Sequence, residues 1–342
     1  MTSKLHTIQY LRAIAAGLVL ISHALLYPTA EEVLLHARLG WLGVIVFFVV
    51  SGFIMVVVTG PGKFAPGQFL RRRVLRVVPL YWAFTLLAAA LAVTLPSLFK
   101  TTVFDGLQML LSLGFIPFYN AGSHGLHPLY KLGWTLNYEM FFYLSFALLA
   151  LLGASGRIWV LTLAYLALAL VGQALHPQDA IPAFYTSYLP LAFVAGAWLG
   201  FAHLKGWLEK VVPGLTWLLA LVGIVALVDG FAIDRGTMED GLAFIGLLLF
   251  AAVLVALAAG MERSLPRLPL LEKLGDASYS IYLTHIFVVA GVVGVVRLLF
   301  GADNPWIVWG AAMAAIPVGI AAGCLLYRLI EEPLLRRLRR LA

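Results

Sequence analysis

Residues 7–27 read TIQYLRAIAAGLVLISHALLY, and this stretch decides the fold class. About 20 residues at 1.5 Å rise per residue cross the roughly 30 Å hydrocarbon core of a bilayer as one helix. The stretch carries Arg12 and His23, which the same rise places about 16 Å apart in depth. An ionisable group inside a bilayer costs roughly 2.5–3.5 kcal/mol, so a chain that keeps one there generally uses it.

The whole chain is unusually apolar. Of its 342 residues, 62% are hydrophobic and 11% are charged, whereas soluble domains carry about 25% charged residues. So much apolar surface cannot be buried in one globular core, and it must face lipid as helices whose backbone groups bond internally. We therefore predict an all-α, polytopic transmembrane bundle of about ten spans, at 8–27, 40–59, 77–98, 134–153, 157–175, 184–203, 213–230, 241–261, 279–300 and 305–328.

The basic residues order these spans across the membrane. With a cytoplasmic N-terminus, all but five of the 23 Lys and Arg residues fall on the cytoplasmic side; the five are Arg38, Lys100, Lys131, Arg235 and Arg297. The positive-inside rule then predicts that both termini are cytoplasmic. The net charge of +7 is explained by these cytoplasmic lysine and arginine residues. We therefore expect the lipid bilayer as a partner and no binding of nucleic acid. We expect one transmembrane domain over residues 1–342, with no appended soluble domain.

Several chemistries are disfavoured by what the sequence lacks. Cys324 is the only cysteine, which excludes an intrachain disulfide and a cysteine-based zinc or iron–sulfur site. The sequence has no H-E-x-x-H metal motif, and GPGK at 60–63 lacks the spacing of a phosphate-binding P-loop. We expect no metal and no permanently bound cofactor.

Polar residues within the predicted spans fall at matching depths. The first span rises from the cytoplasm, so Arg12 lies low and His23 lies in the outer half; the fourth descends, which places Glu139 in the outer half as well. We predict that His23 and Glu139 meet, because a carboxylate that orients an imidazole equips it for general-base attack on an alcohol. The alternatives are a packing histidine bonded to a backbone carbonyl, and for Glu139 a structural bond to Asn137, Tyr138 or a distant arginine.

Further candidate residues lie in three other segments. In FLRRRVLRVVP at 69–79, Arg73 and Arg76 stand one helical turn apart, where two guanidinium groups can grip a phosphate; snorkelling to anionic lipid headgroups is the alternative. His285 suits a structural hydrogen bond and a substrate contact equally well. Ser51 is a conceivable nucleophile, but packing is favoured because no G-x-S-x-G elbow surrounds it.

Three local features are predicted as well. Asp276 or Ser278 is expected to cap the ninth span. The tail PLLRRLRRLA at 333–342 and the basic stretch at 69–79 are expected to form amphipathic helices on the cytoplasmic membrane surface. The apolar piece at 107–117 is too short to span, and it is expected to form a re-entrant or interfacial helix.

An ordered set of these motifs resembles the acyltransferase-3 family of bacterial integral membrane O-acyltransferases. The matching pieces are IQYLRAIAAGLVLISHA, VIVFFVVSGFIM, FLRRRVLRVVPLYW, GWTLNYEMFFYL, LGDASYSIYLTHIF and RLIEEPLLRR, which follow the family's order along the chain. The resemblance implies an enzyme of the bacterial cytoplasmic (inner) membrane. It would move an acyl group, often acetyl, from acyl-coenzyme A as co-substrate to a hydroxyl of a carbohydrate or glycan, such as an exopolysaccharide or O-antigen.

The resemblance also implies roles for individual residues. The family's essential arginine and histidine of the first span map onto Arg12 and His23, its Arg-x-x-Arg pair onto Arg73 and Arg76, and its acidic residue onto Glu139. Three further residues are candidate substrate contacts: His285, Ser51 and Asn137.

These residues lead to one hypothesis and its rivals. In the hypothesis, Arg12, Arg73 and Arg76 hold the donor's phosphates on the cytoplasmic side, while His23, oriented by Glu139, deprotonates the acceptor hydroxyl. A covalent acyl intermediate on His23 is the alternative chemistry. A transporter or flippase of a glycan or lipid-linked sugar is the rival function, since it too would keep buried charges. A structural scaffold would leave the cost of those charges unexplained.

Overall fold

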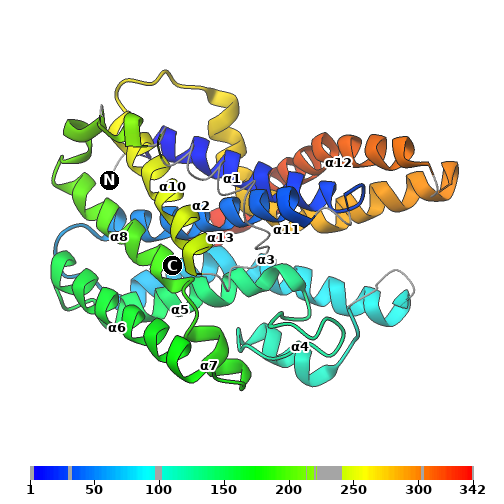
Figure 1. Cartoon of the computed structure of the whole chain (residues 1–342), viewed down its shortest axis with the longest axis horizontal. Coiled ribbons are helices and arrows are strands. Elements are labelled where there is room, and N and C mark those ends of the chain that lie inside the picture. The colour runs from blue at the N-terminus through cyan, green and yellow to red at the C-terminus, as the bar shows by residue number, and fades with distance from the viewer. Residues whose placement is uncertain are drawn as a thin grey trace. The chain divides into compact units, whose positions relative to one another are not determined.

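The computed structural model is helical, and it describes residues 4–29, 33–96, 102–212, 214–218, 221, 241–301 and 304–340 (Figure 1). Within these residues there is no strand, and eight helical stretches are long and apolar enough to span a membrane. The prediction of an all-α bundle of membrane-spanning helices is therefore confirmed. The predicted span at 213–230 lies largely outside the described residues, as do Lys100 and Arg235.

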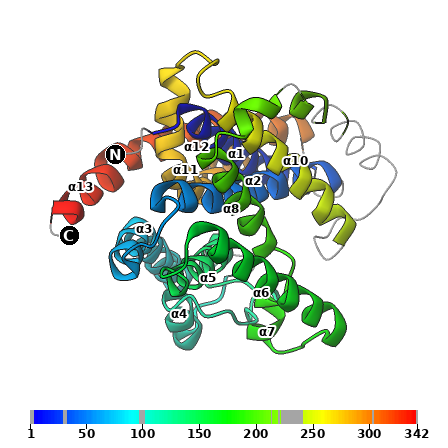
Figure 2. The same ribbon diagram turned by 90° about the vertical axis from the view of Figure 1, so that its left-hand side faces the viewer.

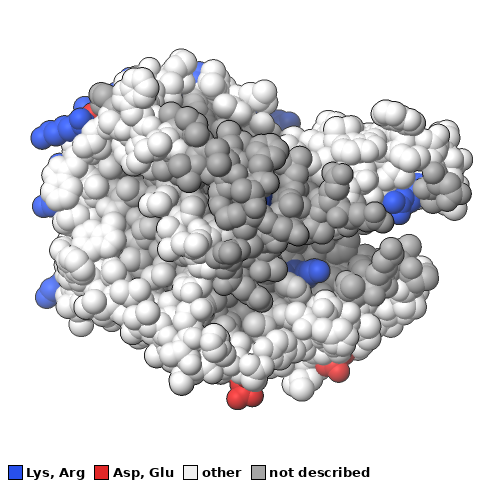
Figure 3. Space-filling model, viewed as in Figure 1, with Lys and Arg blue, Asp and Glu red and all other residues white. Residues whose placement is uncertain are grey.

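The helix bounds follow the apolar stretches of the sequence. They are α1 (His6–Leu25), α2 (Val33–Thr59), α3 (Pro66–Thr94), α4 (Gly106–Leu113), α5 (Trp134–Leu148), α6 (Ala154–Leu175), α7 (Ala180–Tyr185), α8 (Pro190–Leu204), α10 (Gly241–Gly260), α11 (Pro269–Phe300), α12 (Pro305–Leu326) and α13 (Glu332–Arg340). A 3-10 turn, η2 (Lys131–Gly133), precedes α5, and a π-helical turn, η3 (Tyr327–Glu331), joins α12 to α13. Many large apolar side chains are exposed, and charged residues are sparse on the described part of the face drawn in Figure 3, as a lipid-facing surface requires.

The chain divides into two compact units. The first contains Met1–Val58 and Ala195–Leu334, and the second contains Thr59–Val194 and Leu335–Ala342. In the first unit, α1 packs along α11 and α12 and also touches α10 (Figures 1 and 2). In the second unit, α5 packs against α3 and α6, and α4 packs against α3. The first unit therefore joins helices from opposite ends of the sequence, whereas the second joins helices that lie closer together in the sequence.

Proline explains one of the differences from the predicted boundaries. The predicted span at 184–203 is divided into α7 and α8, because Pro190 lacks a backbone N–H and disfavours helical geometry at the residue before it. The basic stretch at 69–79 and the third span, by contrast, form one helix, α3, that continues through Pro79. A proline inside a membrane helix is tolerated where neighbouring groups satisfy the freed carbonyl.

The candidate membrane span Ser278–Phe300 agrees with the predicted ninth span, but the helix that contains it begins earlier. Helix α11 starts at Pro269, a residue type suited to the first helical position because its missing N–H would lack a helical partner there. Asp276 and Ser278 consequently lie inside α11, and the prediction that one of them caps the helix is wrong. The two short helices expected at 107–117 and in the basic tail are present as α4 and α13.

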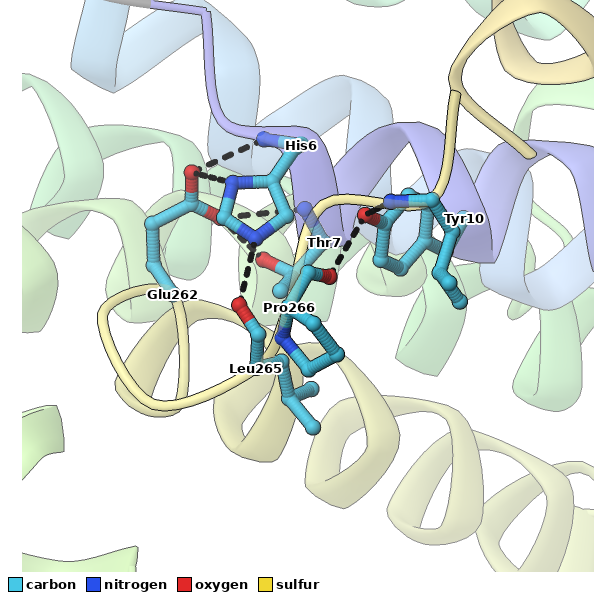
Figure 4. Close-up of polar contacts among 7 residues, drawn as sticks. His6, Thr7, Tyr10, Glu262, Leu265 and Pro266 are labelled. Carbon is cyan, nitrogen blue, oxygen red and sulfur yellow. Dashed lines mark hydrogen bonds and ion pairs between the residues drawn. The ribbon is translucent and has the colours of Figure 1, made fainter. Parts of the chain in front are cut away.

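The start of α1 is capped by a carboxylate from a distant part of the chain. The backbone N–H groups of His6 and Thr7 donate to the two oxygens of Glu262 at 2.8 and 3.0 Å, and the Thr7 hydroxyl donates to it at 2.5 Å (Figure 4). The Tyr10 hydroxyl adds a bond to the carbonyl oxygen of Pro266 at 3.0 Å. The first N–H groups of a helix have no partner within it, and its dipole favours a negative charge there. Glu262 therefore fixes α1 to the segment that follows α10.

A buried arginine joins two connections of the second unit. Arg157 is 0% exposed, and its Nη2 donates to the carbonyl oxygens of Gly62 and Leu152, each at 2.9 Å. Its guanidinium lies 4.5 and 4.7 Å from the ring centroids of Phe64 and Phe146. Carbonyl oxygens and ring faces compensate for the lost hydration of a cation. Arg157, which the sequence places among the cytoplasmic charges, thus holds the α2–α3 and α5–α6 connections together.

Helices α1 and α11 approach each other closely at Gly275. A Cβ atom built there would lie 2.2 Å from the carbonyl oxygen of Gln9. Lipid tails are as apolar as leucine side chains, so membrane helices associate through such close packing and through hydrogen bonds between helices. The absence of a side chain at Gly275 therefore sets how near the two helices come.

We expect Gly275→Ala to destabilise the protein by about 1–3 kcal/mol, because the added methyl group overlaps a backbone atom. The measurement is the thermal midpoint, Tm, of the protein purified in detergent. Gly291→Ala on the same helix is the matched control, since nothing lies within 4 Å of a Cβ atom there. The control should keep or raise Tm because alanine favours helix more than glycine does. Equal effects of the two substitutions would contradict the close approach.

We also expect a pH-dependent contribution from Glu262. Burial raises the pKa of this carboxyl group, but hydrogen bonds from Thr7 and His6 and the charge of His6 lower it more, so its pKa lies below 4.5, its ordinary value. Such a group stabilises the folded state above its unfolded pKa and loses this effect as the pH falls through the folded pKa. Glu262→Gln should lower stability at pH 7 by about 1 kcal/mol, the usual effect of a lost cap.

The difference in Tm between the native protein and Glu262→Gln should shrink as the pH is lowered below 4.5. Glu209→Gln serves as the control, because Glu209 forms an exposed ion pair with Arg263 at 3.4 Å and such pairs contribute little. A Tm difference for Glu262→Gln that is the same at all pH values would refute the capping role.

Candidate active site

The two predicted site residues on α1 both contact α11. Nη2 of Arg12 donates to the Ser278 hydroxyl at 2.9 Å, and Nδ1 of His23 lies 3.3 Å from Nε2 of His285. The contacts occur in the same order along both helices, so α1 and α11 run parallel, as expected for the first and ninth predicted spans. The structure therefore brings His23 together with His285, a pairing that depth in the membrane does not reveal.

The two histidines differ in exposure. His23 is half-buried, and its Nδ1 also lies 2.9 Å from the carbonyl oxygen of Val19. His285 is 0% exposed, and its Nδ1 lies 2.6 Å from the carbonyl oxygen of Tyr282. The rings meet edge to face, with centroids 4.8 Å apart. The bond from His23 to a backbone carbonyl, one of the sequence-based alternatives, is thus present, and it engages one of the two ring nitrogens.

Two hydrogen bonds fix the position of the Arg12 guanidinium. Besides the bond to Ser278, Nη1 donates to the side-chain oxygen of Gln9 at 3.2 Å. Ser278 is 0% exposed, so one end of this arginine is anchored in the interior of the first unit. A guanidinium has five N–H donors, so such an anchor is compatible with a further anionic partner.

In the second unit, Glu139 and Arg73 are linked through a tyrosine. The Tyr143 hydroxyl donates to Oε1 of Glu139, and the Arg73 guanidinium lies 6.0 Å from the Tyr143 ring centroid and 5.8 Å from that of Phe69. Tyr143 was missed by reasoning from the sequence. The sequence feature that could have indicated Tyr143 is its position four residues after Glu139, which places both side chains on one face of α5.

Arg73 and Arg76 line a cavity of about 500 Å³ in the second unit. Its other lining residues include two more arginines of α3 and two leucines of α13: Arg71, Arg72, Leu335 and Leu338. Nε of Arg73 is buried and has no hydrogen-bond partner among the described residues. Guanidinium groups bind phosphate oxygens through charge-assisted bonds, so several of them around one cavity suit an anion with several phosphates. The consecutive arginines were the signal for Arg71 and Arg72, but nothing in the sequence connects α13 to α3.

Asn137 and Ser51 have different surroundings. Asn137 is 2% exposed, and its Oδ1 has no hydrogen-bond partner within the part of the chain that the structure describes. Ser51 is half-buried in α2, where α8 packs so closely that a Cβ atom at Gly196 would lie 1.9 Å from the carbonyl oxygen of Val49. This close helix contact favours the packing role for Ser51.

The remaining predicted contacts join residues of different units. His23 and Arg12 belong to the first unit, whereas Glu139, Arg73 and Arg76 belong to the second. The meeting of His23 with Glu139, and the joint grip of the three arginines, stay predictions.

Comparison with known proteins identifies the family. Residues 5–328 match the acyltransferase domain of the acyltransferase-3 family. The chain is 37% identical over 315 residues to the exopolysaccharide production protein ExoZ of Rhizobium meliloti (strain 1021), covering 92% of this chain and 95% of that protein. It is 28% identical to the acyltransferase MdmB of Streptomyces mycarofaciens, over 90% of this chain and 84% of the relative, and 28% identical to nodulation protein 10 of Rhizobium leguminosarum bv. viciae, over 86% and 82%.

No solved structure matches the chain. The family match covers nearly all of both compact units, and it includes the histidine pair, the arginines of α3 and Glu139. With its membrane-spanning helices, the chain therefore belongs to the acyltransferase-3 family and is a membrane acyltransferase.

Proposed function

We propose that this enzyme moves an acetyl group from cytoplasmic acetyl-coenzyme A to a hydroxyl of a carbohydrate or glycan. The similarity to a protein of exopolysaccharide production along nearly the full chain supports a polysaccharide as the acceptor. The observation that carries the chemistry is the surroundings of His23. Its Nδ1 lies against the Val19 carbonyl at 2.9 Å, and histidine is the side chain that most often serves as a general base near neutral pH.

The hydrogen bond of His23 determines which nitrogen is the base. A carbonyl oxygen only accepts, so Nδ1 carries the proton and Nε2 carries the lone pair of the neutral ring. In the reaction, Nε2 takes the proton of the acceptor hydroxyl as the hydroxyl oxygen attacks the thioester carbonyl carbon. The carbon–sulfur bond then breaks, and the coenzyme A thiolate receives the proton from Nε2. General-base assistance of this kind contributes about 10²- to 10⁴-fold.

Two residues of the second unit complete the acceptor side in this proposal. Glu139, the predicted partner of His23, contributes the negative charge that stabilises the His23 imidazolium. Asn137 accepts a hydrogen bond from a sugar hydroxyl at Oδ1, an atom that has no partner among the described residues. A buried polar atom without a partner is costly, so a ligand that supplies the missing donor gains affinity and orientation.

The arginine cavity is proposed as the donor site. The nucleotide end of coenzyme A combines phosphates with a flat base, and this cavity combines arginines with leucines. Arg73 and Arg76 bind the phosphates with help from Arg71 and Arg72, and Leu335 and Leu338 of α13 contact the base. Arg12 adds a positive charge that attracts the phosphates of the donor.

The proposal also covers the membrane in which the enzyme acts and the orientation of the chain across it. The chain acts as one acyltransferase domain over residues 1–342 in the bacterial cytoplasmic membrane, with both termini in the cytoplasm. The donor arrives from the cytoplasm, and the glycan is acylated on the outer side. The positive-inside distribution of lysine and arginine supports this orientation.

We expect His23→Ala to abolish acyl transfer, with a loss of at least about 10²-fold, because the base is removed. Mass spectrometry of surface polysaccharides from cells that express each protein shows whether acetyl groups are present. His176→Ala is the control, since His176 is exposed after α6. Both proteins should show the same Tm in detergent. Normal acetylation in cells that express folded His23→Ala would rule out the proposed mechanism.

We expect Arg73→Ala and Arg76→Ala each to weaken acetyl-coenzyme A binding by about 10- to 100-fold, the order of one hydrogen bond to a charged group. Isothermal titration of the purified protein with acetyl-coenzyme A measures this affinity. Leu335→Asp, which places a negative charge in the cavity wall, should weaken it as well. Arg263→Ala is the control, because the Arg263 side chain is 83% exposed and lies outside the cavity. Unchanged affinity in all three cavity variants would place the donor elsewhere.

A further inference from the structure

His285 lies where α1 contacts α11, and its side chain has no solvent-accessible surface. It is 0% exposed, whereas His23, 3.3 Å away, is half-buried. A side chain without accessible surface does not reach a sugar hydroxyl or a thioester. Of the two sequence-based roles for His285, the geometry therefore favours the hydrogen bond, and that bond is made to His23.

The carbonyl partners assign the protons of both rings. Nδ1 of His285 lies 2.6 Å from the Tyr282 carbonyl oxygen, so it donates and carries the proton, which leaves Nε2 of the neutral ring as an acceptor. Nδ1 of His23 donates to the Val19 carbonyl at 2.9 Å, and the same N–H is shared with Nε2 of His285 at 3.3 Å. This one arrangement of protons is consistent with the contact between the two rings and with the contacts to the Val19 and Tyr282 carbonyls.

We propose that His285 is a positioning residue, a neutral acceptor that holds the His23 proton on Nδ1 and so keeps Nε2 of His23 as the basic nitrogen. The inference rests on the proposed function of His23 as general base. It assigns to His285 a role beyond substrate contact, since His285 acts only through His23.

A neutral partner suits this place in the bundle. When His23 accepts a proton at Nε2, its Nδ1–H becomes a charged donor, and its bond to the His285 lone pair strengthens. The titratable side chains that the structure shows against His285 are His23 and Tyr282, whose ring centroid lies 5.8 Å away. A carboxylate at the same fully buried position would bring its own desolvation cost. A neutral histidine whose Nδ1–H donates to the Tyr282 carbonyl oxygen offers Nε2 as an acceptor and adds no buried charge.

Variants of His285 separate positioning from packing. His285→Gln keeps an acceptor oxygen near the place of Nε2, whereas His285→Leu fills the volume without an acceptor. The assay uses radiolabelled acetyl-coenzyme A and the polysaccharide identified from the glycan analysis. Thr284→Val is the matched control on α11, because the Thr284 hydroxyl bonds to a carbonyl of its own helix at 2.8 Å.

We expect His285→Leu to lower kcat by about 10- to 100-fold, the order expected for a hydrogen bond to a charged group, with KM for both substrates unchanged. The acid limb of its kcat–pH profile should move to lower pH, because the His23 imidazolium loses an acceptor. His285→Gln should recover most of kcat and the position of the limb. If His285→Leu does not fold, His285→Asn, whose shorter amide does not reach His23, carries the same expectation. Wild-type kcat with an unshifted limb, or a Gln variant no better than Leu, would overturn the proposal.

A second measurement does not depend on catalysis. Diethyl pyrocarbonate acylates the unprotonated imidazole, so the labelling rate of His23 against pH, read by mass spectrometry of its peptide, reports its basicity. The midpoint should move to lower pH in His285→Leu and stay in place in His285→Gln. If the shift occurs but the native protein transfers no acetyl group, the proposed function fails and the positioning role stands. If transfer is normal and the midpoint does not move, the positioning role alone is refuted.

Discussion

Helices α1 and α11 come so close at Gly275 that no side chain fits between their backbones. In a bilayer, helices gain little by hiding apolar surface from one another, so packing of this kind decides which helices pair. The contact has a chemical result farther along the pair, where His23 and His285 lie at hydrogen-bond distance. Their relative position depends on the helix separation that the glycine allows. Packing and chemistry in the first unit are therefore consequences of the same backbone contact.

Polar groups in this apolar chain fall into two kinds. The hydroxyl groups of Thr85 and Thr162 donate hydrogen bonds to carbonyl oxygens of their own helices. Arg157 is surrounded by carbonyl oxygens and aromatic rings. These groups are satisfied by the protein and serve its structure. Asn137 and Arg73, in contrast, each keep a buried polar atom without a hydrogen-bond partner among the described residues. An atom of this kind gains most from a ligand, which is why we place substrate and donor there.

The apolar stretches predicted most of the fold, because length and hydropathy alone determine whether a segment can span a membrane. They did not predict the break before Pro190 or the early start of α11, which depend on backbone chemistry at single prolines. For the site, depth along a helix gives the height of a residue but neither its face nor its neighbour. Height alone suggested Glu139 as the partner of His23, whereas the contact with His285 follows from how α1 and α11 are packed. The relation of Tyr143 to Arg73 likewise required the structure.

The pairing of α1 with α11 also has a consequence for how the enzyme is made. The two histidines are separated by 262 residues of sequence. At about 5–20 residues per second of synthesis, α1 leaves the ribosome on the order of tens of seconds before its partner. During that interval the unfinished chain has His23 without its neighbour His285, the residue that we propose holds the His23 proton on Nδ1. Synthesis therefore separates the two histidines in time, and a truncated chain that ends before α11 lacks the histidine pair.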